Sequence, residues 1–160
     1  MLFHLIYVST AVIPMSDDDL MYLLKQSRVR NARNRITGML LYRDGHFMQV
    51  LEGDEADVMK IFADIERDQR HKSVDVLRAE YIQYRDFPDW TMGFRNVDKV
   101  DLSTVPGFTR FLEHDFKSNY FCEDSVEAHA MLLAFKDLPE TMEIAESDDC
   151  HNNEFGCRPL

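Results

Sequence analysis

Residues 31–53, NARNRITGMLLYRDGHFMQVLEG, contain the pattern that decides the fold. Largely apolar runs over 36–42 and 46–52 predict two strands, and the Arg-Asp-Gly sequence at 43–45 is typical of a tight hairpin turn. The second strand places Gln49 on an otherwise apolar row. A buried amide costs free energy unless it is hydrogen-bonded, so the partner of Gln49 needs an explanation.

The flanking segments extend this hairpin into a β-α-β-β-α-β-β order. Residues 2–9 are apolar on both alternate rows, which predicts a central strand covered on both faces. Helices are expected over 17–29 (with Ser16 as N-cap) and 54–69, a loop over 28–35, and further strands over 74–84 and 90–94. This order is typical of a ferredoxin-like α+β sheet with both helices on one face, in which Tyr7 lies beside Gln49.

The other face of this sheet is also apolar and needs a cover. Two amphipathic stretches within 102–136 are expected to form helices that bury it. The expected organisation is a domain over 1–98, a helical extension over 99–137 and an acidic, mobile tail over 138–160.

Composition restricts the partners. The net charge of −11, from 18 basic and 29 acidic residues, argues against direct binding to nucleic acid or to an anionic membrane surface. The N-terminus resembles no signal peptide, and no run approaches the length of a membrane span. The three cysteines are expected to be free thiols in a reducing cytoplasm. Cys150, His151 and Cys157 do not match a usual zinc spacing, so no metal site is predicted.

Three groups of residues are candidates for chemistry, and each also has a structural interpretation. Tyr7 and Gln49 form either a satisfied polar pair in the core or a relay to a bound polar ligand. Polar residues at the ends of the two helices either interact favourably with the helix dipoles or surround a flat polar heterocycle. They are Arg30, Asn31, Asp68, Arg70 and His71. Trp90 and Met92, expected on one row of an edge strand, are either core residues or neighbours of an aromatic ligand.

Four separated segments resemble the BLUF family of blue-light sensors that use FAD. They are LIYVS at 5–9, the opening stretch at 31–53, DIERDQRH at 64–71 and Trp-x-Met at 90–92. The resemblance extends from residue 1 to about residue 97. No phosphate-binding, dinucleotide-binding, hydrolase or metalloprotease motif accompanies it, and we expect no enzymatic activity.

The resemblance implies a role for each candidate residue. Tyr7 and Gln49 correspond to the photoactive pair of the family, and Trp90 and Met92 to residues that transmit the signal. The residues that correspond to cofactor-binding positions are Ser9, Leu23, Ser27, Arg30, Asn31, Gln49, Ile65, Asp68, Arg70 and His71. In the family's scheme an electron and a proton leave the tyrosine and return, and the glutamine is left rotated or tautomerised.

The resemblance therefore implies a blue-light photoreceptor that signals to a separate downstream protein and self-associates as an oligomer. Two other functions fit the same fold. One is a flavin-dependent redox enzyme, for which a nicotinamide-binding motif is missing from the sequence. The other is an interaction module without flavin, against which the presence of Tyr7, Asn31, Gln49 and Asp68 argues.

Overall fold

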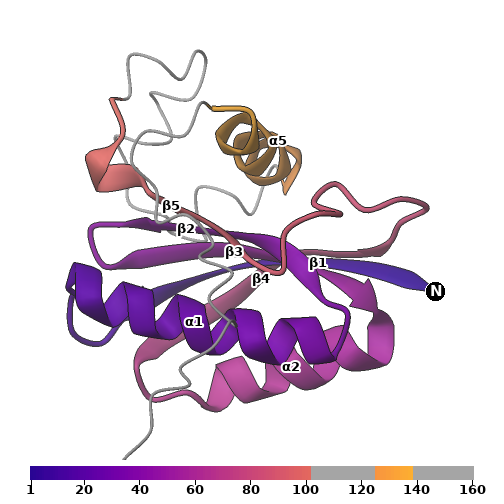
Figure 1. Cartoon of the computed structure of the whole chain (residues 1–160), viewed down its shortest axis with the longest axis horizontal. Coiled ribbons are helices and arrows are strands. Elements are labelled where there is room, and N and C mark those ends of the chain that lie inside the picture. Colours follow the sequence, from indigo (N-terminus) through magenta and orange to yellow (C-terminus); the bar gives the residue numbers. More distant parts are fainter. Residues whose placement is uncertain (102–124, 139–160) are drawn as a thin grey trace, which may run out of the picture.

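A computed structural model describes residues 1–101 and 125–138, in which one five-stranded sheet lies between two layers of helix (Figure 1). The elements in chain order are β1 (Leu2–Ala11), α1 (Asp17–Arg33), β2 (Thr37–Arg43), β3 (His46–Asp54), α2 (Glu55–Arg67), β4 (His71–Tyr81), β5 (Gly93–Asn96), a 3-10 turn (Val97–Lys99) and α5 (Ser125–Lys136).

The sheet has the strand order β4-β1-β3-β2-β5. Neighbouring strands are antiparallel except for the parallel pair of β2 and β5. This arrangement confirms the ferredoxin-like α+β prediction, and the register pairs Tyr7 with Gln49 as expected. The hairpin turn is also confirmed, because Asp44 and Gly45 adopt φ angles of 43° and 78°.

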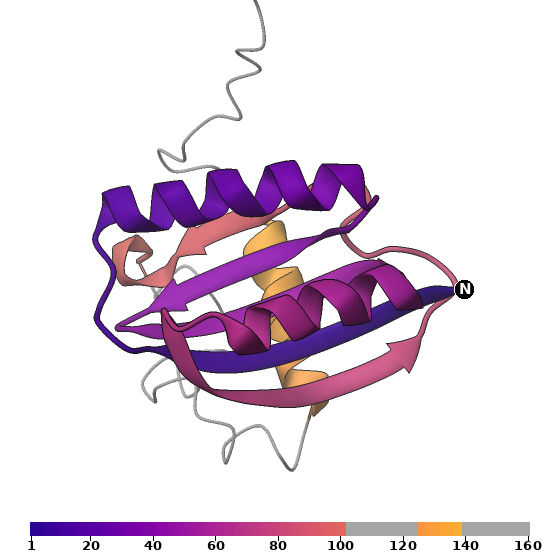
Figure 2. The same ribbon diagram turned by 90° about the horizontal axis from the view of Figure 1, so that it is seen from below.

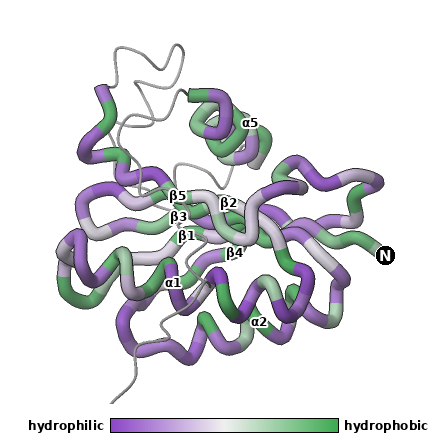
Figure 3. The backbone as a smooth tube through the Cα atoms, in the orientation of Figure 1, coloured by the Kyte–Doolittle hydropathy of each residue, from purple (hydrophilic) through white to green (hydrophobic). Residues whose placement is uncertain are grey.

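The two faces of the sheet bury different cores. Helices α1 and α2 cover one face and α5 covers the other, as Figures 1 and 2 show from perpendicular directions. Along β1, Leu5 and Tyr7 belong to the core under α1 and α2, whereas Ile6 and Val8 belong to the core under α5. Figure 3 shows hydrophobic and hydrophilic positions alternating along α1 and α2, as expected for helices with one buried side.

Gly38 on β2 marks a close approach of two strands. A Cβ atom at this position would lie 1.9 Å from the backbone carbonyl oxygen of Val50 on β3. Only glycine therefore fits at this position, because the neighbouring backbone occupies the space of a side chain.

Three predicted boundaries were wrong. Helix α1 runs through most of the expected loop to Arg33, because the segment contains no glycine or proline and its C-cap is Asn34. Strand β4 covers 71–81 rather than 74–84, since its length is set by pairing with β1.

Strand β5 begins only at Gly93, so Trp90 and Met92 precede it. These two residues do not share a row. Met92 joins the core under α1 and α2, whereas Trp90 packs on the core under α5.

Helix α5 contributes Ala128, Met131, Leu132 and Phe135 to the second core. The helix expected before it and the acidic tail lie outside the described residues, so the division into three regions stays a prediction. Within the described ranges, no helix combines the length and the apolar character needed to cross a bilayer.

Candidate functional site

A cavity of about 260 Å³ lies between α1 and α2 against the central strands. Its walls come from both helices, from β1, β2 and β3, and from the segment that follows α2. The lining residues are Tyr7, Met15, Leu23, Gln26, Ser27, Arg30, Leu40, Phe47, Gln49, Ile65, Asp68, Arg70 and His71. The lining combines apolar side chains with polar and charged groups that converge on the cavity, as in a site for a small molecule.

Tyr7 and Gln49 meet at the cavity as a hydrogen-bonded pair. The Tyr7 hydroxyl donates to Oε1 of Gln49 over 2.5 Å, and Nε2 of Gln49 donates to Sδ of Met92 over 3.2 Å. All three residues are at most 4% exposed. The buried amide is therefore satisfied on both sides, by a strong donor and by the weak acceptor of a thioether.

The Tyr7 phenol is held in its neutral form. Burial raises its pKa far above the usual range, the Arg30 cation opposes this shift, and the Asp68 carboxylate adds to it. Tyr7 consequently enters any reaction as an intact O–H donor. Near neutral pH it keeps this proton unless its electronic state changes.

Charged groups surround one side of the cavity. Arg70 forms a forked pair with the Asp68 carboxylate, with Nη2 at 2.5 Å from Oδ2, and these hydrogen bonds lower the pKa of Asp68 and raise that of Arg70. Burial lowers the pKa of Arg30. A polar or anionic ligand could replace water around these guanidinium groups.

His71 is fixed by two hydrogen bonds just after α2. Its Nε2 lies 2.5 Å from the Ile65 carbonyl, which can only accept, so this nitrogen carries the proton. Its Nδ1 then accepts from the Ser9 hydroxyl at 2.9 Å. Ser9 thereby orients His71 from behind the wall and is not itself among the residues that line the cavity.

Asn31 also lies behind the cavity wall. It is fully buried, its amide nitrogen donates to the Thr91 carbonyl at 2.9 Å, and Nε of Arg30 donates to its Oδ1 at 3.4 Å. Asn31 thus connects α1 to the segment that carries Met92. Its predicted contact with a ligand stays a prediction.

Most of the predicted site residues converge on this cavity, with four differences. Ser9, Asn31 and Met92 lie behind the wall, where Met92 contacts Gln49, and Trp90 belongs to the opposite face. Sequence reasoning did not include Met15, Gln26, Leu40 and Phe47. The strand pattern could have identified two of them, because Phe47 shares the row of Gln49 and Leu40 pairs with Gln49 across the hairpin.

The residues of this cavity fit the ring system of a flavin. Leu23 and Ile65 supply apolar surface from the two helices, and the polar atoms of Gln49 and Arg30 can meet the heteroatoms of a flat ring. The volume is slightly below the ~300–1,000 Å³ of pockets that enclose a whole ligand. It would therefore hold the ring rather than a whole dinucleotide.

Comparisons with known proteins agree with this site. The chain is 39% identical over 115 residues to the photoactivated adenylate cyclase subunit beta of Euglena longa. The matched region spans 71% of this chain but only 13% of that protein. It resembles the dark-state structure of the BLUF protein BlrB with a TM-score of 0.68 at 32% identity, covering 84% of this chain and 96% of the other. The photo-activated state of BlsA gives a TM-score of 0.73 at 26% identity, covering 90% and 100%.

The model of one family matches residues 2–93, which include all of the strands described before β5 and every cavity residue. The description of this family is "Sensors of blue-light using FAD". The chain therefore belongs to the BLUF family of blue-light photoreceptors, which use FAD as chromophore.

Proposed function

We propose that this protein converts blue light into a hydrogen-bond switch centred on Gln49, and that a separate protein detects the result. The observation that carries this proposal is the continuous chain from Tyr7 through Gln49 to Met92 beside the cavity. When bound, the flavin supplies blue-light absorption and, in its excited state, oxidising power. Residues of the chain carry the proton transfer and the change in hydrogen bonding that follow.

The first step concerns the Tyr7 proton. Loss of an electron turns a phenol into a strong acid, and Oε1 of Gln49 at 2.5 Å is positioned to take the proton. Return of the electron and the proton restores neutral Tyr7, whose raised pKa keeps the phenol protonated in the dark. The amide of Gln49 is left rotated or tautomerised, and no covalent bond has changed.

The second step concerns the partner that Gln49 gives up. The thioether of Met92 is a weak acceptor, so Gln49 can leave it at little cost. Met92 directly precedes β5, and Arg95 on β5 donates to the carbonyl oxygens of Phe135 at 3.1 Å and Leu138 at 3.0 Å. A shift of Met92 would therefore reach the C-terminal end of α5 through β5.

We infer that the cofactor contacts include Leu23, Ser27, Arg30, Ile65, Asp68, Arg70 and His71, which line the cavity, together with Ser9 and Asn31 behind it. BLUF domains act as sensors, and we propose that this chain has no catalytic activity of its own. Its output would pass to a separate signalling protein and through self-association. The cytoplasmic location and the absence of nucleic-acid and membrane binding stay predictions from composition.

Absorption spectroscopy tests this function. The purified protein should be yellow, and blue light should produce a small red shift of the flavin bands that reverses in the dark. Tyr7→Phe and Gln49→Leu should bind flavin yet lose the shift, because each removes one member of the relay. A normal photocycle in either variant would contradict the mechanism, and absorbance without any light response would point to a redox flavoprotein.

A further inference from the structure

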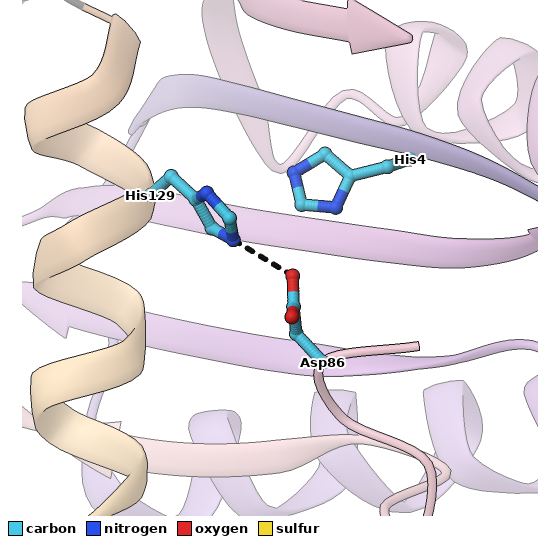
Figure 4. A group of neighbouring side chains, drawn as sticks. All are labelled: His4, Asp86 and His129. Atoms are coloured by element: carbon cyan, nitrogen blue, oxygen red, sulfur yellow. Dashed lines mark hydrogen bonds and ion pairs between the residues drawn. The ribbon is translucent and has the colours of Figure 1, made fainter. Parts of the chain in front are cut away.

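A second polar cluster lies on the opposite side of the sheet from the cavity. It combines His4 of β1, Asp86 of the 82–92 segment and His129 of α5 (Figure 4). One candidate ligand atom from each residue lies within 4.8 Å of the others. His129 Nε2 and Asp86 Oδ2 are already hydrogen-bonded at 2.8 Å.

His4 contributes a nitrogen whose hydrogen-bonding capacity is unused. The residue is fully buried, and within the described part of the chain its Nε2 has no hydrogen-bond partner. Such an atom is costly in a core. Figure 4 shows the ring of His4 lying beside Asp86 and His129. The unpartnered nitrogen therefore lies close to two other side chains that can bind a metal ion.

The other nitrogen of His4 is held by a buried carboxylate. Nδ1 lies 3.3 Å from Oε1 of Glu52, which can only accept when ionised, so Nδ1 carries the proton and Nε2 keeps its lone pair. Glu52 is fixed in turn, because it accepts from the backbone N–H groups of Asp86 and Phe87 at 3.2 and 3.0 Å. A carboxylate that orients a histidine in this way is the usual outer shell of a metal-binding imidazole.

We propose that His4, Asp86 and His129 bind a divalent transition-metal ion of the Zn²⁺ class. Two imidazoles and one carboxylate are a common ligand set for such ions and leave a coordination position for water. Bond lengths near 2.0–2.2 Å place ligand atoms ~3.4 Å apart in a tetrahedron. The two ligand atoms that lie farthest apart must therefore move closer together. Nε2 of His129 and Oδ2 of Asp86, now 2.8 Å apart, must move farther apart. The side chains of His129 and Asp86 are 22% and 35% exposed, which gives an ion access and these groups freedom to adjust.

Two cations face the cluster and must be accommodated. Nη1 of Arg78 lies 3.4 Å from Nδ1 of His129, and Lys136 donates to the backbone carbonyl of Asp86. Binding of the ion at Nε2 of His129 would put a proton on Nδ1 and displace Arg78. Arg78 already pairs with Glu80 at 2.5 Å and can remain there.

This site would connect three elements that lie far apart in the sequence. A bound ion would fasten α5 to β1 and to the segment that leads into Met92, which is the part of the molecule expected to move. The ligands are separated by 82 and 43 residues in the sequence. No local motif therefore marks the site, and this is why the sequence predicted no metal.

Calorimetric titration of the chelator-treated 160-residue chain with ZnCl₂ in the dark tests the proposal. We expect one ion per chain and a rise in Tm on binding. Asp86→Asn and His129→Gln should each weaken Zn²⁺ binding by at least ~10-fold, the lower limit for losing even an outer-shell group. Asp89→Asn is the matched control, because it removes the same charge from an exposed position in the same segment.

Cobalt(II) separates this site from the cysteines. Ligation by nitrogen and oxygen gives d–d absorption without the thiolate charge-transfer band that Cys122, Cys150 or Cys157 would add. Unchanged affinity in Asp86→Asn and His129→Gln, a thiolate band, or no measurable binding would overturn the proposal. Because binding is measured in the dark, these outcomes do not depend on whether the Gln49 switch operates.

Discussion

At the scale of single residues, Gln49 is distinguished by two unequal hydrogen bonds. Oε1 accepts from a phenol at 2.5 Å, whereas Nε2 donates to a thioether at 3.2 Å. The sequence predicted the first of these partners, because strand topology alone places Tyr7 beside Gln49. Met92 was indicated only by the family resemblance and not by strand topology, because it precedes β5 and reaches Gln49 from an irregular segment.

Met92→Leu should leave the photocycle intact but change its rate. Leucine fills similar volume, so the free energy of unfolding should fall by less than ~1.5 kcal/mol. Nε2 of Gln49 loses its partner, however, and the dark and lit amide states change in relative energy. We expect flavin binding and a red shift with dark recovery altered several-fold, measured by absorption after a light pulse. Met59→Leu, on an exposed part of α2, is the control and should recover at the wild-type rate.

Tyr7 should also affect stability at alkaline pH. Its pKa is raised in the folded protein, so an unfolded chain releases the phenol proton first, near pH 10. The contribution of Tyr7 is complete below pH 10 and is lost as pH rises toward the folded value, at up to ~1.4 kcal/mol per pH unit. Tyr7→Phe should therefore flatten the fall of unfolding free energy above pH 10 in denaturant titrations. An identical slope in Tyr7→Phe and wild type would contradict this, and Tyr84→Phe, at an exposed site, should leave the slope unchanged.

At the scale of elements, periodicity predicted what local residues determine. The alternation over β1 and β3, the turn at 43–45 and the apolar stripe of α2 all appear in the structure. The predicted boundaries were wrong where contacts between distant parts of the sequence determine them. The length of β4 follows its pairing with β1, and the start of β5 follows the packing of Trp90, whose ring lies 2.3 Å from where a Cβ of Gly93 would be.

Helix α5 should be separable from the flavin site. Phe135 is fully buried against the face of the sheet opposite the cavity, so Phe135→Ala should lower the free energy of unfolding by about 3–5 kcal/mol. The core under α1 and α2 is untouched. We expect flavin to remain bound below the lowered Tm, with faster amide exchange in α5. Loss of flavin under native conditions would show that the two cores are not independent.

At the scale of the whole molecule, hydrogen bonds at one edge of the sheet connect β5 to α5. Arg95 is 4% exposed and donates to the carbonyl oxygens of Phe135 and Leu138, so it joins β5 to the end of α5. β5 is the edge strand of the sheet and pairs with β2 (Figure 1). This connection crosses 40 residues of sequence, which explains why only the structure revealed it.

Hydrogen–deuterium exchange in the dark and under blue light should locate the signal. We expect the light-dependent differences in the 87–96 segment and in α5, with little change in α2. Arg95→Met should keep the spectral shift but lose the difference in α5, because the hydrogen bonds to its last turn are gone. Light-dependent exchange in α5 of this variant would contradict the proposed route. Arg67→Met on α2, on the other side of the sheet, should keep both responses.

The alternation of side chains along β1 has a consequence for how the chain can vary in length. Odd-numbered positions such as Tyr7 face the chromophore side, and even-numbered positions such as His4 and Ile6 face the output side. A shift of this strand by one residue in register would exchange the two sets, burying the phenol under α5 and pointing His4 into the light-sensing cavity. Parity along a single strand thus keeps light detection and signal output on separate surfaces, and loops rather than this strand must absorb insertions and deletions.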